Sequence, residues 1–184
     1  MLADSLEDSL LNVARARGEA VLKDRIERLF VELRSDVYRY LLSLGLHPPQ
    51  AQEATQEVFL RLYVALTEDK ETIRNPKAWI FRVAHNYGLK VRARGAHELP
   101  YDPEVAARLV DPEITPEMSL IERERARRFH QAVENLSEQQ RRCLLLRLEG
   151  LRYPEIGAVL GISASAVGEF LRRAVVRLRS LADA

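Results

Sequence analysis

Residues 153–167 read YPEIGAVLGISASAV, the pattern of a short helix, a tight turn and a second helix. The first helix is apolar at Ile156 and Val159 and runs into Gly161, which suits the left-handed backbone that ends a helix. Ser163 can accept a hydrogen bond from the free amides at the start of the next helix. The pattern predicts a helix-turn-helix, a unit that presents its second helix to the major groove of DNA. An ordinary helical corner without a ligand is the alternative.

The second of these helices has an apolar side and a basic side. Arginine pairs with phosphates and makes bidentate contacts with guanine edges, so the basic side is predicted to contact nucleic acid. A solvated cationic face is the other interpretation. The core-facing set is Val167, Phe170, Leu171, Ala174, Val175 and Leu178, and the outward set is Ser165, Glu169, Arg172, Arg173, Val176, Arg177 and Arg179.

The total charge of +1 hides four segments of alternating sign. Residues 1–71 sum to −4, residues 72–97 to +6, residues 98–117 to −5 and residues 118–184 to +4. Two basic segments separated by an acidic one indicate two surfaces for a polyanion and a spacer that avoids it.

Prolines mark the domain boundary. Four of the eight prolines fall within residues 98–117 among acidic residues, a composition typical of a linker. No strand alternation is visible, so we predict an all-α protein of two small helical domains joined by this acidic, proline-rich linker. The N-terminal domain is expected at residues 24–97 and the helix-turn-helix domain at residues 118–184. Residues 1–23 form an extension in which Leu2, Leu6, Leu10 and Val13 can make an amphipathic helix.

Several classes of protein are excluded by what the sequence lacks. No apolar run is long enough to cross a membrane, and the acidic N-terminus does not resemble a signal peptide. Cys143 is the single cysteine and is expected to be a small buried apolar residue. The four histidines lack metal-ligand spacing, and no phosphate loop, partnered nucleophile or acidic pair is present. We expect a cytoplasmic binding protein without cofactor or metal, and not an enzyme.

The helix after Pro48 and Pro49 is predicted to carry a protein-docking stripe. Its inner side is apolar, and its outer side shows two aliphatic residues framed by polar and acidic ones, a combination that favours protein contact. Alternatively, a helix formed by residues 2–17 covers the aliphatic pair. The stripe consists of Glu53, Gln56, Glu57, Leu60 and Val64.

Asn75 and Pro76 predict the start of another helix, with asparagine as its cap and proline in its first turn. Interleaved aromatic and basic side chains on a solvent-exposed face suit single-stranded nucleic acid, where bases stack and phosphates pair. The predicted buried set is Trp79, Ile80, Val83, Ala84, Tyr87 and Val91, and the predicted outer set is Phe81, Arg82, His85, Asn86, Arg92 and Arg94.

Three stretches, taken in order, resemble bacterial sigma factors. Residues 50–63, QAQEATQEVFLRLY, resemble the family's helix that binds core RNA polymerase. Residues 75–86, NPKAWIFRVAHN, resemble its promoter-melting helix. Residues 136–142, LSEQQRR, together with residues 151–179, resemble its C-terminal helix-turn-helix domain. The short length and the lack of a middle domain point to the extracytoplasmic-function group.

The resemblance implies a subunit that joins core RNA polymerase, directs it to promoters and initiates transcription. The implied polymerase-binding residues are Glu53, Gln56, Glu57, Leu60 and Val64. The residues implied to open and read the −10 element are Lys70, Arg74, Phe81, Arg82, His85, Asn86 and Arg92. Those implied to bind the −35 element as duplex are Ser163, Ser165, Glu169, Arg172, Arg173 and Arg177. An anti-sigma factor is a further candidate partner.

Two positions depart from the family's pattern. Gly168-Glu169-Phe170 stands where the recognition helix usually has a polar or basic run. Glu169 is expected to point outward, where it either repels phosphate or accepts from a cytosine amine, and we favour the cytosine interpretation. Lys90 stands where an aspartate is common and adds positive charge near the melted strand.

Two other classes of protein explain part of the pattern. A helix-turn-helix transcriptional regulator with an N-terminal sensing or dimerisation domain accounts equally well for the C-terminal half. It accounts poorly for the basic, aromatic-bearing helix after Asn75. A protein that occupies polymerase without initiating transcription would explain the acidic residue at position 169.

Overall fold

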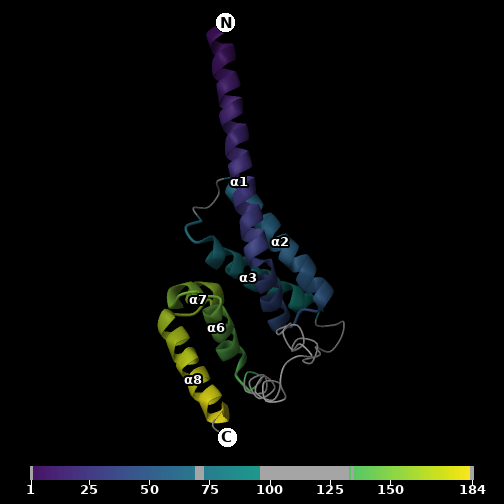
Figure 1. Ribbon diagram of the computed structural model, residues 1–184. Helices are drawn as coiled ribbons and strands as arrows, with labels where there is room; N and C mark the ends of the chain where they lie inside the picture. The colour runs from purple at the N-terminus through teal and green to yellow at the C-terminus, as the bar shows by residue number, and fades with distance from the viewer. Residues whose placement is uncertain (1, 69–72, 96–132, 134, 183–184) are drawn as a thin grey trace, which may run out of the picture.

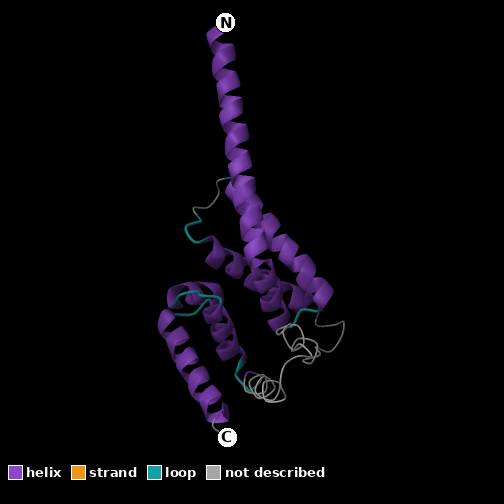
Figure 2. Cartoon of the chain, viewed as in Figure 1, coloured by secondary structure: helices purple, strands orange, loops and turns teal. Residues whose placement is uncertain are grey.

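The computed structural model describes residues 2–68, 73–95, 133 and 135–182, and its description of side chains begins at residue 18. The predicted linker and Lys70 lie outside the described residues. The described part consists of helices with no strand, which confirms the all-α prediction (Figure 1; Figure 2). The helices are α1 (Leu2–Ser43), α2 (Pro48–Thr67), α3 (Pro76–Gly95), α6 (Glu138–Leu148), α7 (Tyr153–Leu160) and α8 (Ala164–Ala182).

Helix α1 is continuous, whereas the sequence predicted a separate N-terminal helix before residue 24. Its N-terminal half extends away from the other helices (Figure 1). Residues 19–28 contain neither proline nor glycine, so nothing in this stretch ends a helix. Ion pairs one turn apart add support, with Lys23 Nζ 3.8 Å from Glu27 Oε1 and Arg28 Nη2 2.6 Å from Asp24 Oδ2.

The N-terminal domain is built from the C-terminal half of α1 packed against α2 and α3. Aromatic pairs in edge-to-face geometry join the helices, with ring centroids 5.0 Å apart for Phe30 and Phe59 and 5.5 Å apart for Tyr40 and Phe81. The buried aliphatic residues of this core include Leu33, Val37, Leu41, Val58, Leu62, Ile80 and Ala84.

Helix α3 turns a different face to the core than the sequence predicted. Phe81 is fully buried and His85 is only 5% exposed, so the prediction that they lie on a solvent-exposed face is wrong. Trp79, predicted to be buried, is only partly covered at the edge of the core. Trp79 and Phe81 are both aromatic and lie on either side of Ile80, so the apolar periodicity could not show which of the two is buried. Gly88 is buried in this register, and a Cβ there would lie 2.9 Å from the side chains of both Leu41 and Leu44.

The C-terminal helices form the predicted helix-turn-helix. Gly161 has a φ of 68°, and the Ser163 hydroxyl accepts a hydrogen bond from the Ala166 amide at 3.1 Å, so both predicted roles are confirmed. The turn is so tight that the Ile162 amide donates to the Gly157 carbonyl at 3.0 Å. Val175 was predicted to be buried, but its side chain is 41% exposed and lies at the edge of the apolar side of α8. The core here includes Leu146, Leu151, Ile156, Val159, Val167, Leu171 and Ala174.

The two helical groups are in contact, chiefly where α7 packs against α3. This contact places the first helix of the helix-turn-helix beside the helix that the sequence predicted to bind single-stranded nucleic acid. The polar contacts across it join Asn75 Nδ2 to Glu155 Oε1 at 2.8 Å, Lys77 Nζ to Glu149 Oε2 at 3.6 Å and Arg92 Nη1 to Glu138 Oε1 at 2.8 Å.

Candidate nucleic-acid and protein interfaces

The outward side of α8 is basic and exposed, as the sequence predicted. Arg172, Arg173 and Arg177 all project into solvent from this side, and Ser165 is exposed at its start. Ser163 is exposed as well, but its hydroxyl is engaged as the cap of the helix. The arrangement suits a helix that enters a groove of duplex DNA with several cations facing the phosphates.

Glu169 lies within this basic side and is bound by two arginines of the same helix. Arg172 donates from Nε and Nη2 to its carboxylate at 2.9 and 2.8 Å, and Arg173 donates from Nε at 2.6 Å. These hydrogen bonds lower the pKa of Glu169 to about 2. The sequence predicted an outward carboxylate here but not its two partners.

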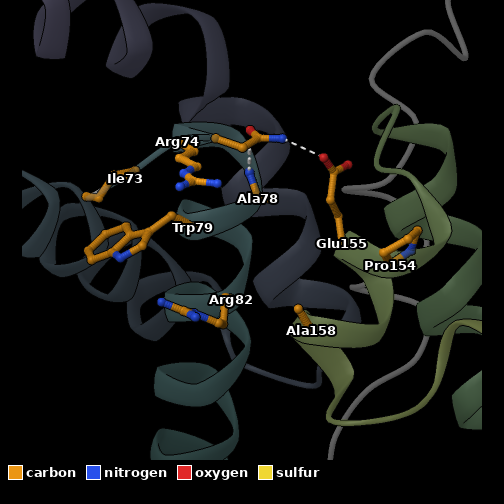
Figure 3. A pocket seen from close by; sticks show the side chains of 9 residues that line it. Ile73, Arg74, Ala78, Trp79, Arg82, Pro154, Glu155 and Ala158 are labelled. Carbon is orange, nitrogen blue, oxygen red and sulfur yellow. Dashed lines mark hydrogen bonds between the residues drawn. The ribbon is translucent and has the colours of Figure 1, made fainter. Parts of the chain in front are cut away.

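A cleft of about 560 Å³ separates the start of α3 from α7 (Figure 3). Arg74 and Arg82, both predicted to contact the −10 element, line it on the α3 side. Asn86 is exposed further along α3, whereas Arg92 near its C-terminal end donates to the Leu44 carbonyl at 3.2 Å and to Glu138. The cleft is lined by Ile73, Arg74, Asn75, Ala78, Trp79, Arg82, Pro154, Glu155 and Ala158.

Asn75 has a second role that the sequence did not reveal. Its side-chain oxygen accepts from the Ala78 amide at 3.1 Å, as predicted for a cap, and its amide nitrogen donates to Glu155 across the cleft. Hydrogen bonds from the Arg152 backbone amide and from Asn75 lower the pKa of Glu155. No sequence signal links Asn75 to Glu155, because they lie 80 residues apart.

Phe81 and His85 do not join the cleft-lining arginines. His85 Nδ1 lies 3.0 Å from the Tyr40 hydroxyl inside the core. Burial, together with the positive charge of Arg142, lowers the pKa of His85 to about 4. A neutral, buried histidine and a buried phenylalanine are not available to a base or a phosphate in this arrangement.

The predicted docking stripe on α2 is open to solvent. Leu60 is 57% exposed and Val64 is 40% exposed, so the alternative that another described segment covers them is wrong. Glu53 and Gln56 are exposed, and Glu57 is paired with Arg61 at 2.7 Å. Tyr63, which is 46% exposed, belongs to the same surface and was missed, although its position three residues after Leu60 could have indicated it.

Metal-binding and membrane-spanning features are absent from the described part of the chain. Within it, no group of three or more His, Cys, Asp or Glu side chains is arranged to hold a metal ion. None of the described helices combines the length and the apolar character needed to cross a bilayer.

Both halves of the chain match models of known protein regions. The model of sigma-70 region 2 matches residues 29–95, which include the end of α1 with α2 and α3. The model of sigma-70 region 4 matches residues 126–178, which include α6, α7 and most of α8. The helical bundle followed by the helix-turn-helix is therefore the two-region plan of a sigma-70 protein.

Similarities over most of the chain show to which group of sigma-70 proteins it belongs. The chain is 33% identical over 138 residues to the ECF RNA polymerase sigma factor ShbA of Streptomyces griseus, covering 72% of this chain and 71% of the relative. It is 30% identical over 152 residues to the RNA polymerase sigma factor CnrH of Cupriavidus metallidurans, covering 77% and 78%. Its fold is similar to that of the sigma factor RpoE of Bartonella quintana, solved in complex with the anti-sigma factor NepR, with a TM-score of 0.62, 20% identity and coverage of 85% and 96%. The chain belongs to the extracytoplasmic-function (ECF) sigma factors.

Proposed function

We propose that this sigma factor docks on core RNA polymerase through α2 and divides promoter recognition between α3 and α8. As a sigma factor, the chain associates with core RNA polymerase and directs transcription initiation at promoters. The observation that supports separate roles for these helices is that their candidate binding surfaces are separate. The exposed apolar stripe and the two basic surfaces lie on three different helices.

Helix α8 binds the −35 element as duplex DNA. Its exposed arginines support this role, and the cap at Ser163 stabilises the start of the helix, the end that a recognition helix presents to base edges. Arg177 contacts phosphate and contributes affinity without base preference. Ser163 and Ser165 at the N-terminal end of the helix contact the backbone or a base edge.

Helix α3 opens and reads the −10 element with a smaller set of residues than the sequence analysis named. Arg74, Arg82 and Asn86 are retained because each is exposed, and Trp79 is added because it lines the same cleft as Arg74 and Arg82. Phe81 and His85 are left out because both are buried. Arg92 contributes positive charge once its contact with Glu138 is released.

Leu60, Tyr63 and Val64 dock on polymerase, with Glu53, Gln56 and Glu57 as the polar rim of the surface. An apolar centre with a charged rim is the usual anatomy of a protein interface. The activity is binding and positioning of DNA, so the chain is not an enzyme by itself, and it acts in the cytoplasm where polymerase and promoters are. The solved complex of RpoE with NepR supports an anti-sigma factor as a further partner.

Run-off transcription tests the function. Core RNA polymerase is mixed with the full chain and with fragments of the source genome, and the transcripts are sequenced. A sigma factor gives transcripts with defined 5′ ends that are absent with core polymerase alone. Fragments bound by the chain without core polymerase, with no new transcripts, would favour the helix-turn-helix regulator. Binding to core polymerase without new transcripts would favour a protein that only occupies polymerase.

A further inference from the structure

Glu169 is the only acidic residue on the basic side of α8, and both of its carboxylate oxygens are occupied by arginines. Arg172 and Arg173 follow it by three and four residues, so both lie one turn further along the same side of the helix. Arg172 grips the carboxylate with two parallel hydrogen bonds, from Nε to Oε2 at 2.9 Å and from Nη2 to Oε1 at 2.8 Å. Arg173 donates from Nε to Oε1 at 2.6 Å. One carboxylate therefore holds two guanidinium groups side by side.

These contacts leave the outer end of each guanidinium available. A guanidinium group carries five N–H donors in a planar fork. Glu169 takes the Nε hydrogen of both arginines and one Nη2 hydrogen of Arg172. Nη1 and Nη2 of each arginine retain hydrogens that point away from the carboxylate. That pair of donors matches O6 and N7 of guanine, or two oxygens of a phosphate.

We propose that Glu169 is a positioning residue that presents Arg172 and Arg173 to the −35 duplex as a fixed pair and does not itself read a base. The proposal rests on the role of α8 in −35 binding proposed above. A free arginine loses side-chain entropy when it is ordered against DNA, and an arginine already held in place loses less. The carboxylate therefore increases the preference for sequences whose guanine edges fit the preset pair over sequences that do not fit it.

The cytosine interpretation of Glu169 fits the geometry poorly. Oε1 already accepts from both arginines and Oε2 accepts from Arg172. Three of the roughly four acceptor sites of the carboxylate are therefore taken, only one site on Oε2 is left for a cytosine amine, and a turn of the carboxylate toward the base would break the parallel pair with Arg172. Repulsion of DNA by Glu169 does not explain the arrangement either. Arg172 and Arg173 carry two positive charges against the single negative charge of Glu169, so the cluster keeps a net charge of +1.

The test uses the holoenzyme, assembled from core polymerase and the full chain, with promoter DNA that has a fixed −10 element and a randomised −35 element. Base preferences come from the enriched sequences, and the salt slope comes from binding to the preferred sequence at several salt concentrations. Glu169→Gln keeps the size of the side chain and removes its charge. Arg177→Ala is the matched control, because Arg177 lies eight residues from Glu169, roughly 12 Å along the helix axis.

The proposal predicts three linked changes in Glu169→Gln. Binding to all sequences tightens at low salt, and the salt slope steepens by roughly one unit because a carboxylate no longer balances the arginines. Preference falls roughly fivefold to a hundredfold at the same base positions that Arg172→Ala or Arg173→Ala relaxes. Glu169→Asp, which keeps a carboxylate, retains more of the preference than Glu169→Gln. In a chain that lacks both arginines, Glu169→Gln changes no preference, and Arg177→Ala only lowers the affinity and the slope.

Other outcomes overturn the proposal. A preference lost at one C·G pair that neither arginine variant affects would make Glu169 a base reader. Uniform tightening with every preference intact would leave repulsion as its only role. A wild-type holoenzyme that enriches no −35 sequence would instead contradict −35 binding by α8, and this result appears before any variant is compared.

Discussion

At the scale of single residues, Gly157 is the position where the helix-turn-helix leaves no room for a side chain. A Cβ on Gly157 would lie 2.6 Å from the backbone carbonyl oxygen of Ile162, which cannot move without opening the turn. Gly157→Ala is therefore expected to lower the free energy of unfolding by about 1–3 kcal/mol. Gly168→Ala is the control within the same unit, because its Cβ would meet the Tyr153 ring at an ordinary 3.5 Å. Urea denaturation measures both, and equal stabilities would contradict the close approach.

His85 makes stability depend on pH. Its pKa falls from 6.5 to about 4 in the folded protein, mainly through burial, so the unfolded chain binds its proton at higher pH than the folded chain does. Stability is therefore expected to fall as the pH drops from about 6.5 to about 4, by about 3 kcal/mol in total. His85→Gln should flatten the curve of unfolding free energy against pH in this interval. An unchanged curve would mean that His85 binds its proton equally well in the folded and the unfolded chain, as an exposed histidine does.

At the scale of single helices, α2 presents an apolar surface that has no structural task in the described part of the chain. Changing Leu60 and Val64 to serine is expected to leave stability within about 1 kcal/mol, because both side chains are exposed. The affinity for core RNA polymerase is expected to fall on the order of tenfold or more, because apolar groups at the centre of an interface carry much of its energy.

Val31→Ser is the control for this pair, since Val31 is 75% exposed on α1 and lies outside the stripe. It should change neither stability nor polymerase affinity. A double variant that melts early, or that binds polymerase as tightly as the wild type, would contradict the assignment of the stripe.

The elements whose structure depends on local chemistry were predictable from sequence. The caps at Asn75 and Ser163 and the left-handed Gly161 are decided by residues within a few positions, and all three agree with the structure. The register of α3 was not predictable, because it depends on how Gly88 packs against Leu41 of α1 and Leu44 in the turn that follows α1. The pairing of Asn75 with Glu155 was hidden for the same reason, since only the packing of α3 on α7 brings them together.

At the scale of the whole molecule, the contact between the two helical domains combines apolar packing with polar contacts, and buried residues of both domains, among them Phe81 and Ile156, belong to one hydrophobic cluster. Its ion pairs, Lys77 with Glu149 and Arg92 with Glu138, are partly exposed to solvent, and such pairs contribute about 0–1 kcal/mol each. Burial and the nearby Asp36 carboxylate raise the pKa of Glu149, so this end of the contact includes repulsion. If α3 reads the −10 strand as proposed, α7 has to move away from the face of α3 that lines the cleft.

Separation of the domains can be followed through Trp79, the only tryptophan of the chain, which lines the cleft between them. The double variant Lys77→Glu and Arg92→Glu places carboxylates opposite Glu149 and Glu138 and should separate the domains. Its tryptophan emission should shift to longer wavelength and its radius of gyration in X-ray scattering should increase. The wild type should approach the same values at 1 M salt, where the Debye length is about 3 Å.

The matched control is Lys23→Glu with Arg28→Glu, which makes the same change in net charge but alters only ion pairs within α1. It should leave the tryptophan emission and the radius of gyration at wild-type values in low salt. The separated variant should also quench more readily with acrylamide than the control, because Trp79 lines the cleft between α3 and α7 and opening this cleft gives the quencher more access to it. If salt and charge reversal leave both measurements unchanged, apolar packing between α3 and α7 holds the domains together. In that case α7 would stay over Arg82, and reading of the −10 strand would have to use the part of α3 one turn further along the same face, around Asn86.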